Sequence, residues 1–206
     1  MSDAPKKSTL ADHIQKNTMD NEMLEKEILH FLDEASSKPG ATDKPGCPLQ
    51  HGLACVLCTV HDGMPRATPI DFFADGMTLW LAGEPGLKIR NIRSNAQVAV
   101  GIYHPVDHSV LNRSLQISGT ASLIPYAGHE QEFIDRLKIM GVYAAAAKIM
   151  TERLAAPGQE AGSFDEGIIK ALKRFNLIKI EPEEITYLWI HPTEGAQKNI
   201  WKKAAA

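Results

Sequence analysis

The sequence predicts an α+β protein built on a small antiparallel β-barrel, closed or split, with peripheral helices. Three observations support this class. Short apolar and β-branched runs are separated by Asp-Gly turn pairs at 62–63 and 75–76. The stretch 114–125 alternates cleanly between apolar and polar residues, as a half-buried antiparallel strand does. Helical spacing of apolar residues occurs on both sides of this β region, so helices are expected at its edges.

The composition indicates one ordinary globular protein. The chain has 206 residues, of which 44% are hydrophobic and 23% charged, which is typical of an ordered domain. A net charge of -3 gives no global attraction to nucleic acid or acidic membranes. The start of the chain lacks a signal-peptide core, and no stretch reaches the roughly 18 apolar residues of a spanning helix. We therefore expect a cytoplasmic protein with neither a nucleic-acid nor a membrane partner.

The first 46 residues are expected to form a helical arm and a linker. Thr18 and Asp20 are possible caps of a helix that ends near Ser36. Its apolar residues share one face. They are Leu24, Ile28, Phe31 and Leu32. The Gly- and Pro-rich segment after Ser36 predicts a flexible connection.

Residues 47–206 are expected to form the barrel domain. Strands are predicted at 54–61, 65–73, 77–82, 97–104 and 114–125, with a short helix at 87–95. Leu115, Ile117, Gly119, Ala121 and Leu123 fall on one face of the last of these strands.

The C-terminal part combines helices with two further strands. A long helix is predicted at 129–156, where Pro157-Gly158 ends it, and a shorter one at 165–175. The apolar run 176–192 predicts two short strands. The remaining tail is expected to form a surface helix.

All three cysteines lie close together, at Cys47, Cys55 and Cys58, with His51 between them. A C-x-x-C pair is a metal or redox pattern. However, residues three apart on a strand point to opposite faces, so Cys55 and Cys58 could not meet at one ion. We favour reduced, structural cysteines and predict no metal site. The pair His104 and His108 is likewise expected in a solvated loop, because Pro105 forbids the helix that would align them.

Polar residues at successive strand ends point to an anion site. Arg66 and Thr68 share a strand face, Lys88 opens the short helix, and Asn91 lies one turn further on. Backbone N–H groups at a helix start, together with a lysine, suit a phosphate. Arg66 could clamp the same anion in a bidentate manner, and Arg113 could add a third cation.

The order of these motifs resembles the pyridoxamine 5'-phosphate oxidase-like FMN-binding split barrels. The resemblance is clear over 48–125 and weaker as far as Ile190. It rests on "LCTVHDGMPRATPIDFFADGMTLWLAG", on "GLKIRNIRSNAQVAVGIY" and on "RSLQISGTASLI". The combination of the three in this order is more specific than any one of them.

The resemblance implies a set of cofactor-binding residues. Arg66, Ala67, Thr68 and Pro69 match the strand that lines the ribityl phosphate and ring edge of FMN, and Lys88 matches a lysine that contacts the phosphate.

Further residues of the implied site come from other strands. Trp80 and Leu81 match positions that approach the flavin, while Arg113 and Ser114 match the start of a strand that reaches the flavin, often that of a neighbouring subunit. The resemblance also implies a homodimer with flavin at the interface.

Some positions depart from the family pattern. Gly86 and Leu87 stand where many members have a serine and a basic residue, and Asp71 stands near a basic position of the vitamin-processing oxidases. Trp189 and Trp201 lack the arginines that accompany the substrate-binding tryptophan in those oxidases. These departures favour a looser flavin-binding relative over a true pyridoxamine 5'-phosphate oxidase.

The resemblance therefore implies an FMN-binding oxidoreductase that acts on a small molecule or accepts electrons from a small donor, with no catalytic residue assigned. The pocket above the ring would involve helix 129–156 or the N-terminal arm. The same barrel type can hold haem or the deazaflavin F420, and a non-enzymatic flavin carrier or sensor is a further alternative. The candidate haem ligands would be His51, His61, His104, His108 and His191.

Overall fold

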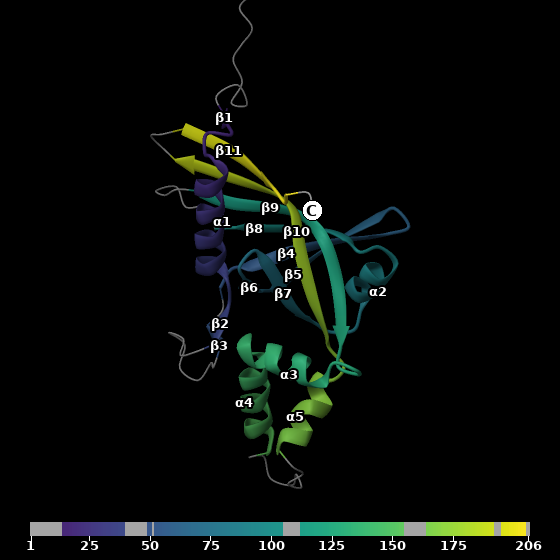
Figure 1. The fold of residues 1–206 in the computed structure, drawn as a ribbon. Helices are drawn as coiled ribbons and strands as arrows, with labels where there is room; N and C mark the ends of the chain where they lie inside the picture. The colour runs from purple at the N-terminus through teal and green to yellow at the C-terminus, as the bar shows by residue number, and fades with distance from the viewer. Residues whose placement is uncertain are drawn as a thin grey trace, which may run out of the picture.

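A nine-stranded sheet and five helices form the part of the chain that the structure, a computed structural model, describes: residues 14–39, 49–50, 52–104, 112–154, 164–191 and 195–204 (Figure 1). The strands are β1 (Ile14–Lys16), β4 (Ala54–His61), β5 (Met64–Asp71), β6 (Phe73–Asp75), β7 (Thr78–Gly83), β8 (Gln97–Tyr103), β9 (Asn112–Pro125), β10 (Asn176–His191) and β11 (Gly195–Lys202). The helices are α1 (Asn21–Ala35), α2 (Leu87–Ser94), α3 (Glu130–Ile139), α4 (Val142–Leu154) and α5 (Phe164–Leu172). A separate pair is formed by β2 (Lys38–Pro39) and β3 (Leu49–Gln50). The predicted α+β class is confirmed.

The sheet curls into a barrel that stays split. Its order is β1-β11-β10-β9-β8-β4-β5, and β7 joins β6 to the first half of β10. All pairs are antiparallel except β1 with β11. β5 contacts β7, yet the hydrogen-bonded ladder does not continue between them. The opening therefore lies beside β5, the strand on which the sequence placed the anion site.

Apolar side chains fill the barrel, and α1 contributes to this core. Asp20 caps the helix by accepting a hydrogen bond from the Met23 N–H at 2.8 Å. The buried face of the helix consists of Leu24, Ile28, Phe31, Leu32 and Ala35, all in the barrel core. Each large apolar side chain buried in this way contributes about 1.5–3 kcal/mol. The predicted helix is thus confirmed, and it packs as an integral part of the body.

A second, smaller core lies between β7 and the inserted helices α3 and α5, at the lower end of Figure 1. The predicted helix 129–156 is in fact two helices, because Gly141 between them has φ 76°, a left-handed conformation that ends α3. Phe133 and Leu137 of α3 are fully buried against this second core. The predicted helix 165–175 corresponds to α5.

The predicted pair of short strands at 176–192 is a single long strand, β10. Its register shifts between Pro182 and Glu184, which accommodates a proline without ending the strand. Opposite Pro182 lies Gly119, where a Cβ atom would overlap the Glu181 carbonyl oxygen. The absence of a side chain there lets the two strands approach.

The C-terminal tail was expected to be helical, and this prediction is wrong. It forms β11, which pairs with β10 on one side and with β1 on the other. The buried Asn199 side chain accepts a hydrogen bond from the Met19 N–H at 3.1 Å, which joins the strand to the start of α1. Tertiary pairing therefore outweighs the weak local preference of this segment.

Candidate functional site

The predicted anion-binding strand, β5, is an edge strand of the sheet. Arg66 lies opposite Thr59 of β4, and Thr68 lies opposite Leu57. Opposed residues of an antiparallel pair share a face of the sheet, and Thr59 and Leu57 are buried. Arg66 and Thr68 therefore lie on the core side of β5, at the split. Their intervening neighbour Ala67 is on the other face, as is Pro69.

Helix α2 brings Asn91 to the same place. The Asn91 Nδ2 group donates a hydrogen bond of 3.0 Å to Thr59 Oγ1, and both side chains are buried. Lys88 lies one turn earlier on the same helix face and is half-buried. Thr59 is therefore paired with Arg66 in the sheet and bonded to Asn91 of α2, and these residues together with Thr68 and Lys88 are here called the Thr59 cluster. Arg66 itself is exposed, and the use of these residues as an anion site stays a prediction.

The start of α2 carries further hydrogen-bond donors. Gly86 precedes the helix, and no side chain caps its first turn. The first N–H groups of such a helix lack intrahelical partners, and the helix dipole makes this end attractive to an anion. Ile89 and Ile92 anchor the helix in the barrel core, so these donors are held in place.

Thr68 provides the most informative atom of this region. Its Oγ1 is buried and has no hydrogen-bond partner within the described part of the chain. A buried hydroxyl without a partner costs about 1–3 kcal/mol. Such an atom, two residues from Arg66 on the same strand face, is suited to an external group that carries oxygen or nitrogen atoms.

Trp80 and Leu81 point away from each other across β7. Leu81 is in the barrel core, whereas Trp80 belongs to the second core. The Arg136 guanidinium lies 4.0 Å from the centre of a Trp80 ring, and the Lys179 amine lies 6.0 Å from it. Arg136 also pairs with Asp75 at 3.0 Å. Trp80 and Leu81 were both predicted to approach the flavin. In the structure Trp80 faces the second core beside the inserted helices, and Leu81 faces the barrel core.

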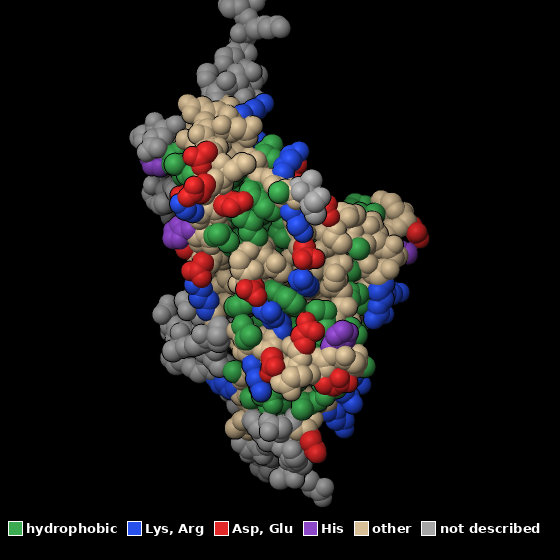
Figure 2. Space-filling view, in the orientation of Figure 1, with side chains coloured by type: hydrophobic (Ala, Val, Ile, Leu, Met, Phe, Trp, Pro, Cys, Tyr) green, Lys and Arg blue, Asp and Glu red, His purple; other side chains and the backbone are tan. Residues whose placement is uncertain are grey.

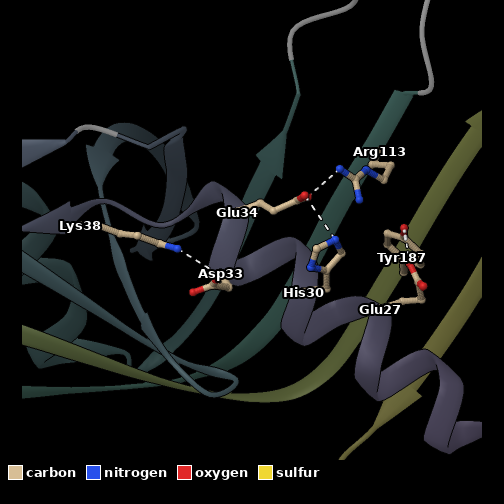
Figure 3. A network of polar contacts seen from close by, with 7 residues as sticks. All are labelled: Glu27, His30, Asp33, Glu34, Lys38, Arg113 and Tyr187. Atoms are coloured by element: carbon tan, nitrogen blue, oxygen red, sulfur yellow. Dashed lines mark hydrogen bonds and ion pairs between the residues drawn. The ribbon is translucent and has the colours of Figure 1, made fainter. Parts of the chain in front are cut away.

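Arg113 and Ser114 lie at the other end of the barrel. The Arg113 Nη2 atom is 2.7 Å from Glu34 Oε2 of α1, and its guanidinium carbon is 5.5 Å from the centre of the Phe31 ring. Figure 3 shows Glu34 between Arg113 and His30. Ser114 is paired with Tyr103 of β8.

Strand register separates Arg113 from the Thr59 cluster. Gly101 of β8 lies opposite Val56 of β4, and His104, whose N–H bonds to the Arg113 carbonyl oxygen, lies further from Thr59. Arg113 is therefore not brought to Arg66 within one chain. Its role towards a flavin, including that of a second subunit, stays a prediction.

An apolar pocket of about 230 Å³ opens at the end of β5. Its lining joins the strand end to the helical insertion: Ser37, Ile70, Asp71, Phe72, Phe73, Ala82, Met140, Val142, Ala145 and Phe175. The sequence indicated only that helix 129–156 or the N-terminal arm would contribute to a pocket. It gave no sign that the break at Gly141 would set Met140 and Val142 at its wall.

The sequence profile of one family, described as "Pyridoxamine 5'-phosphate oxidase", matches residues 48–189. This span includes the whole Thr59 cluster. The chain belongs to the pyridoxamine 5'-phosphate oxidase family. No curated protein matches this chain.

Solved structures similar to this family member come from several bacteria. A Listeria innocua protein described as a pyridoxamine 5'-phosphate oxidase has 23% identity, with 79% of this chain and 95% of that chain covered and a TM-score of 0.46. A FAD-binding protein from Mesorhizobium loti has 18% identity, coverage of 66% and 85%, and a TM-score of 0.45. A pyridoxamine 5'-phosphate oxidase-related, FMN-binding protein from Nostoc punctiforme has 16% identity, coverage of 74% and 87%, and a TM-score of 0.47.

The histidines proposed as alternative haem ligands are scattered over this family member. His61 is exposed and contacts Ser94 Oγ at 3.0 Å, and His191 stacks on Trp189. The Nε2 atom of His104 is buried without a described partner, and its ring packs edge-on against Phe31 at 5.1 Å. Burial, followed by the charge of Arg113, lowers the pKa of His104. His51 and His108 lie outside the described residues.

Cys55 and Cys58 lie on opposite faces of β4, as strand geometry requires. Cys55 is buried in the core, whereas Cys58 lies on the other face and is half-buried. Burial raises the pKa of the Cys55 thiol to about 12. Cys47 lies outside the described residues. Within the described ranges, no three His, Cys, Asp or Glu side chains converge as metal ligands.

Proposed function

We propose that this family member binds a flavin nucleotide, FMN in the first instance, at the Thr59 cluster beside the barrel split. The unpartnered, buried Thr68 hydroxyl carries this proposal. It lies on the same strand face as the Arg66 cation, and Lys88 and the first turn of α2 supply further positive charge. Together these groups match the needs of a phosphorylated ligand with additional polar atoms.

Each residue then has a distinct binding role. Arg66 and Lys88 would hold the phosphate, and the α2 N–H groups would complete its coordination. The Thr68 hydroxyl would donate a hydrogen bond further along the ligand. Asn91 is already bonded to Thr59, so it would fix the position of α2 rather than bind the phosphate itself.

The pocket at the end of β5 would accept the substrate or electron donor. A bound flavin would supply hydride or electron transfer, so the protein has to orient the ring and control access to it. Ile70 lies two residues beyond Thr68 on the same strand face, and it also lines the pocket. The apolar walls formed by Phe73 and Met140 would exclude water, and Asp71 would place a carboxylate at this wall. We therefore propose an oxidoreductase that acts on a small, largely apolar substrate.

A homodimer is part of the same proposal. The outward side of β5 carries no strand partner in the described sheet, and Met64 at its start is 73% exposed. Natural edge strands of this kind are usually covered. A second subunit placed here would cover the split and enclose the flavin.

No helix among those described is long and apolar enough to cross a membrane.

The test is an FMN titration of cofactor-free protein, followed by flavin fluorescence. Replacement of both Arg66 and Lys88 by Ala should weaken binding by at least about 3 kcal/mol, because hydrogen bonds to charged groups contribute about 1.5–3 kcal/mol each. The control is Lys16→Ala/Lys203→Ala, which removes two exposed charges elsewhere. Equal affinities of the two double variants would refute the assigned phosphate site.

A further inference from the structure

Two adjoining basic hollows lie on the side of α2 that faces away from the Thr59 cluster. One, of about 450 Å³, is lined by Pro85, Gly86, Ile89, Arg90, Arg93, Arg174 and Asn176. The other, of about 880 Å³, is lined by Glu84, Pro85, Gly167, Lys170, Ala171, Lys173, Arg174 and Phe175. They share Pro85 and Arg174, and the two together are here called the α2–α5 groove.

Five cations line the α2–α5 groove. They are Arg90, Arg93, Lys170, Lys173 and Arg174, and all five are exposed. Glu84 is the carboxylate of the lining. In the described ranges none of the five cations forms an ion pair. Figure 2 shows Lys and Arg side chains along the right-hand edge, over α2 and further down towards α5.

Helix geometry directs the groove cations of α2 away from the side chains of the proposed flavin site, although Gly86, which precedes α2, borders both sites. Arg90 is two residues after Lys88, and Arg93 is two residues after Asn91. At 3.6 residues per turn, positions two apart point in nearly opposite directions. Asn91 contacts Thr59 on the barrel side, so Arg90 and Arg93 present their charges to the other side, towards α5. The flavin site therefore does not account for them.

The chemistry of the groove indicates the kind of ligand. Arginine side chains bind phosphate oxygens in a bidentate manner. Arg90 and Arg93 are neighbours on one face of α2. Lys170 lies in the last turn of α5, and Lys173 and Arg174 lie in the turn that follows the helix, so the groove offers one row of donors from α2 and another from the end of α5. Ile89 and Phe175 add apolar surface between these rows. Both volumes lie in the range of about 300–1,000 Å³ that is usual for small-ligand sites.

We propose that the α2–α5 groove binds a small ligand with two or more linked phosphates, of the nucleoside di- or triphosphate class. One phosphate would lie against α2 and another against α5, with Arg174 between them. Nucleic acid is a weaker match, because the chain carries a net charge of -3 and so has no overall attraction for a long polyanion.

Calorimetric titration of the full-length protein with tripolyphosphate, orthophosphate and ADP tests this proposal. We expect tripolyphosphate and ADP to bind more tightly than orthophosphate and to compete with each other. Arg93→Ala/Arg174→Ala should weaken tripolyphosphate binding by about a hundredfold, since two charge-assisted contacts are lost. Lys16→Ala/Lys203→Ala, with the same change in charge, should bind as the wild type does. Arg66→Ala/Lys88→Ala should also retain tripolyphosphate binding, which keeps this result independent of the flavin site.

Three results would overturn the proposal. The first is a wild-type protein that binds none of the polyphosphates. The second is equal tripolyphosphate affinity in Arg93→Ala/Arg174→Ala and in its charge-matched control. The third is binding of a single-stranded oligonucleotide or of anionic vesicles under conditions in which tripolyphosphate and ADP do not bind.

Discussion

Replacement of Thr68 by Val should stabilise the cofactor-free protein and lower its affinity for FMN. Valine has nearly the same shape as threonine but lacks the hydroxyl, and Thr68 Oγ1 is buried without a described partner. Removing such an atom should raise the free energy of unfolding by about 1 kcal/mol, the low end of the usual penalty, because the residue as a whole is only half-buried. For a chain of this size the melting temperature should rise by about 2–4 °C.

The effect on binding should have the opposite sign. If the hydroxyl bonds to an oxygen of the flavin nucleotide, its loss should weaken FMN binding by about tenfold or more. Thermal unfolding of cofactor-free protein and fluorescence titration with FMN measure the two effects separately. A variant that is destabilised, or one that binds FMN as tightly as the wild type, would refute the reasoning.

Thr59→Val is the matched control. The Thr59 hydroxyl accepts the hydrogen bond from Asn91 at 3.0 Å, and the Asn91 side chain is buried. The substitution would leave that amide without an acceptor, at a cost of about 1–3 kcal/mol. The same chemical change should therefore destabilise the protein at Thr59 and stabilise it at Thr68.

The remaining predictions concern the barrel core and the titratable groups in it. Phe31→Ala should lower the free energy of unfolding, measured in urea, by about 3–5 kcal/mol, because Phe31 is fully buried in the barrel core. A decrease below about 1 kcal/mol would show that α1 does not pack into the core. Burial and the charge of Arg113 lower the pKa of His104 from 6.5. Below pH 6.5 the unfolded chain therefore binds a proton at His104 more readily than the folded chain does, so the free energy of unfolding should fall as the pH drops below 6.5. His104→Gln should flatten this dependence between pH 7.5 and 5.5, and an unchanged slope would exclude His104 as its source. Cys55, fully buried with a pKa raised to about 12, should resist iodoacetamide at pH 8 longer than Cys58 does, as peptide mass spectrometry would show; equal labelling would contradict the core position of Cys55.

The regular elements of the barrel were predictable because their patterns are local. Alternation along 114–125 identified β9 and the inward positions of Leu115 and Ile117, which are buried. The helical spacing from Leu24 to Leu32 likewise identified α1. Whether α1 would pack into the core could not be read from its own periodicity, since an amphipathic face does not specify its partner.

The errors occurred where tertiary contacts decide the structure. The tail became β11 because β1 and β10 offer pairing partners on both sides. The break at Gly141 lies in a run of strong helix formers, where a single glycine is often tolerated, so one long helix was the natural expectation.

The candidate site was predictable in part. The sequence already shows Arg66 and Thr68 on one strand face and Lys88 and Asn91 at the start of a short helix. The structure keeps the first two on β5 and the other two on α2, and their binding of a phosphate stays a prediction. The orientation of Trp80 towards α3 depends on a second core that the sequence does not reveal. Whether the Thr68 hydroxyl lacks a partner depends on every neighbouring atom and is visible only in three dimensions.

The most direct test of the central claim is the visible absorption spectrum of the purified protein after reconstitution with FMN and removal of unbound ligand, with acid release and mass identification of the bound molecule. The account predicts flavin absorption bands and the mass of FMN, retained by the wild type and lost in Arg66→Ala/Lys88→Ala. A protein that emerges colourless, or one that shows a Soret band and releases haem, would contradict it.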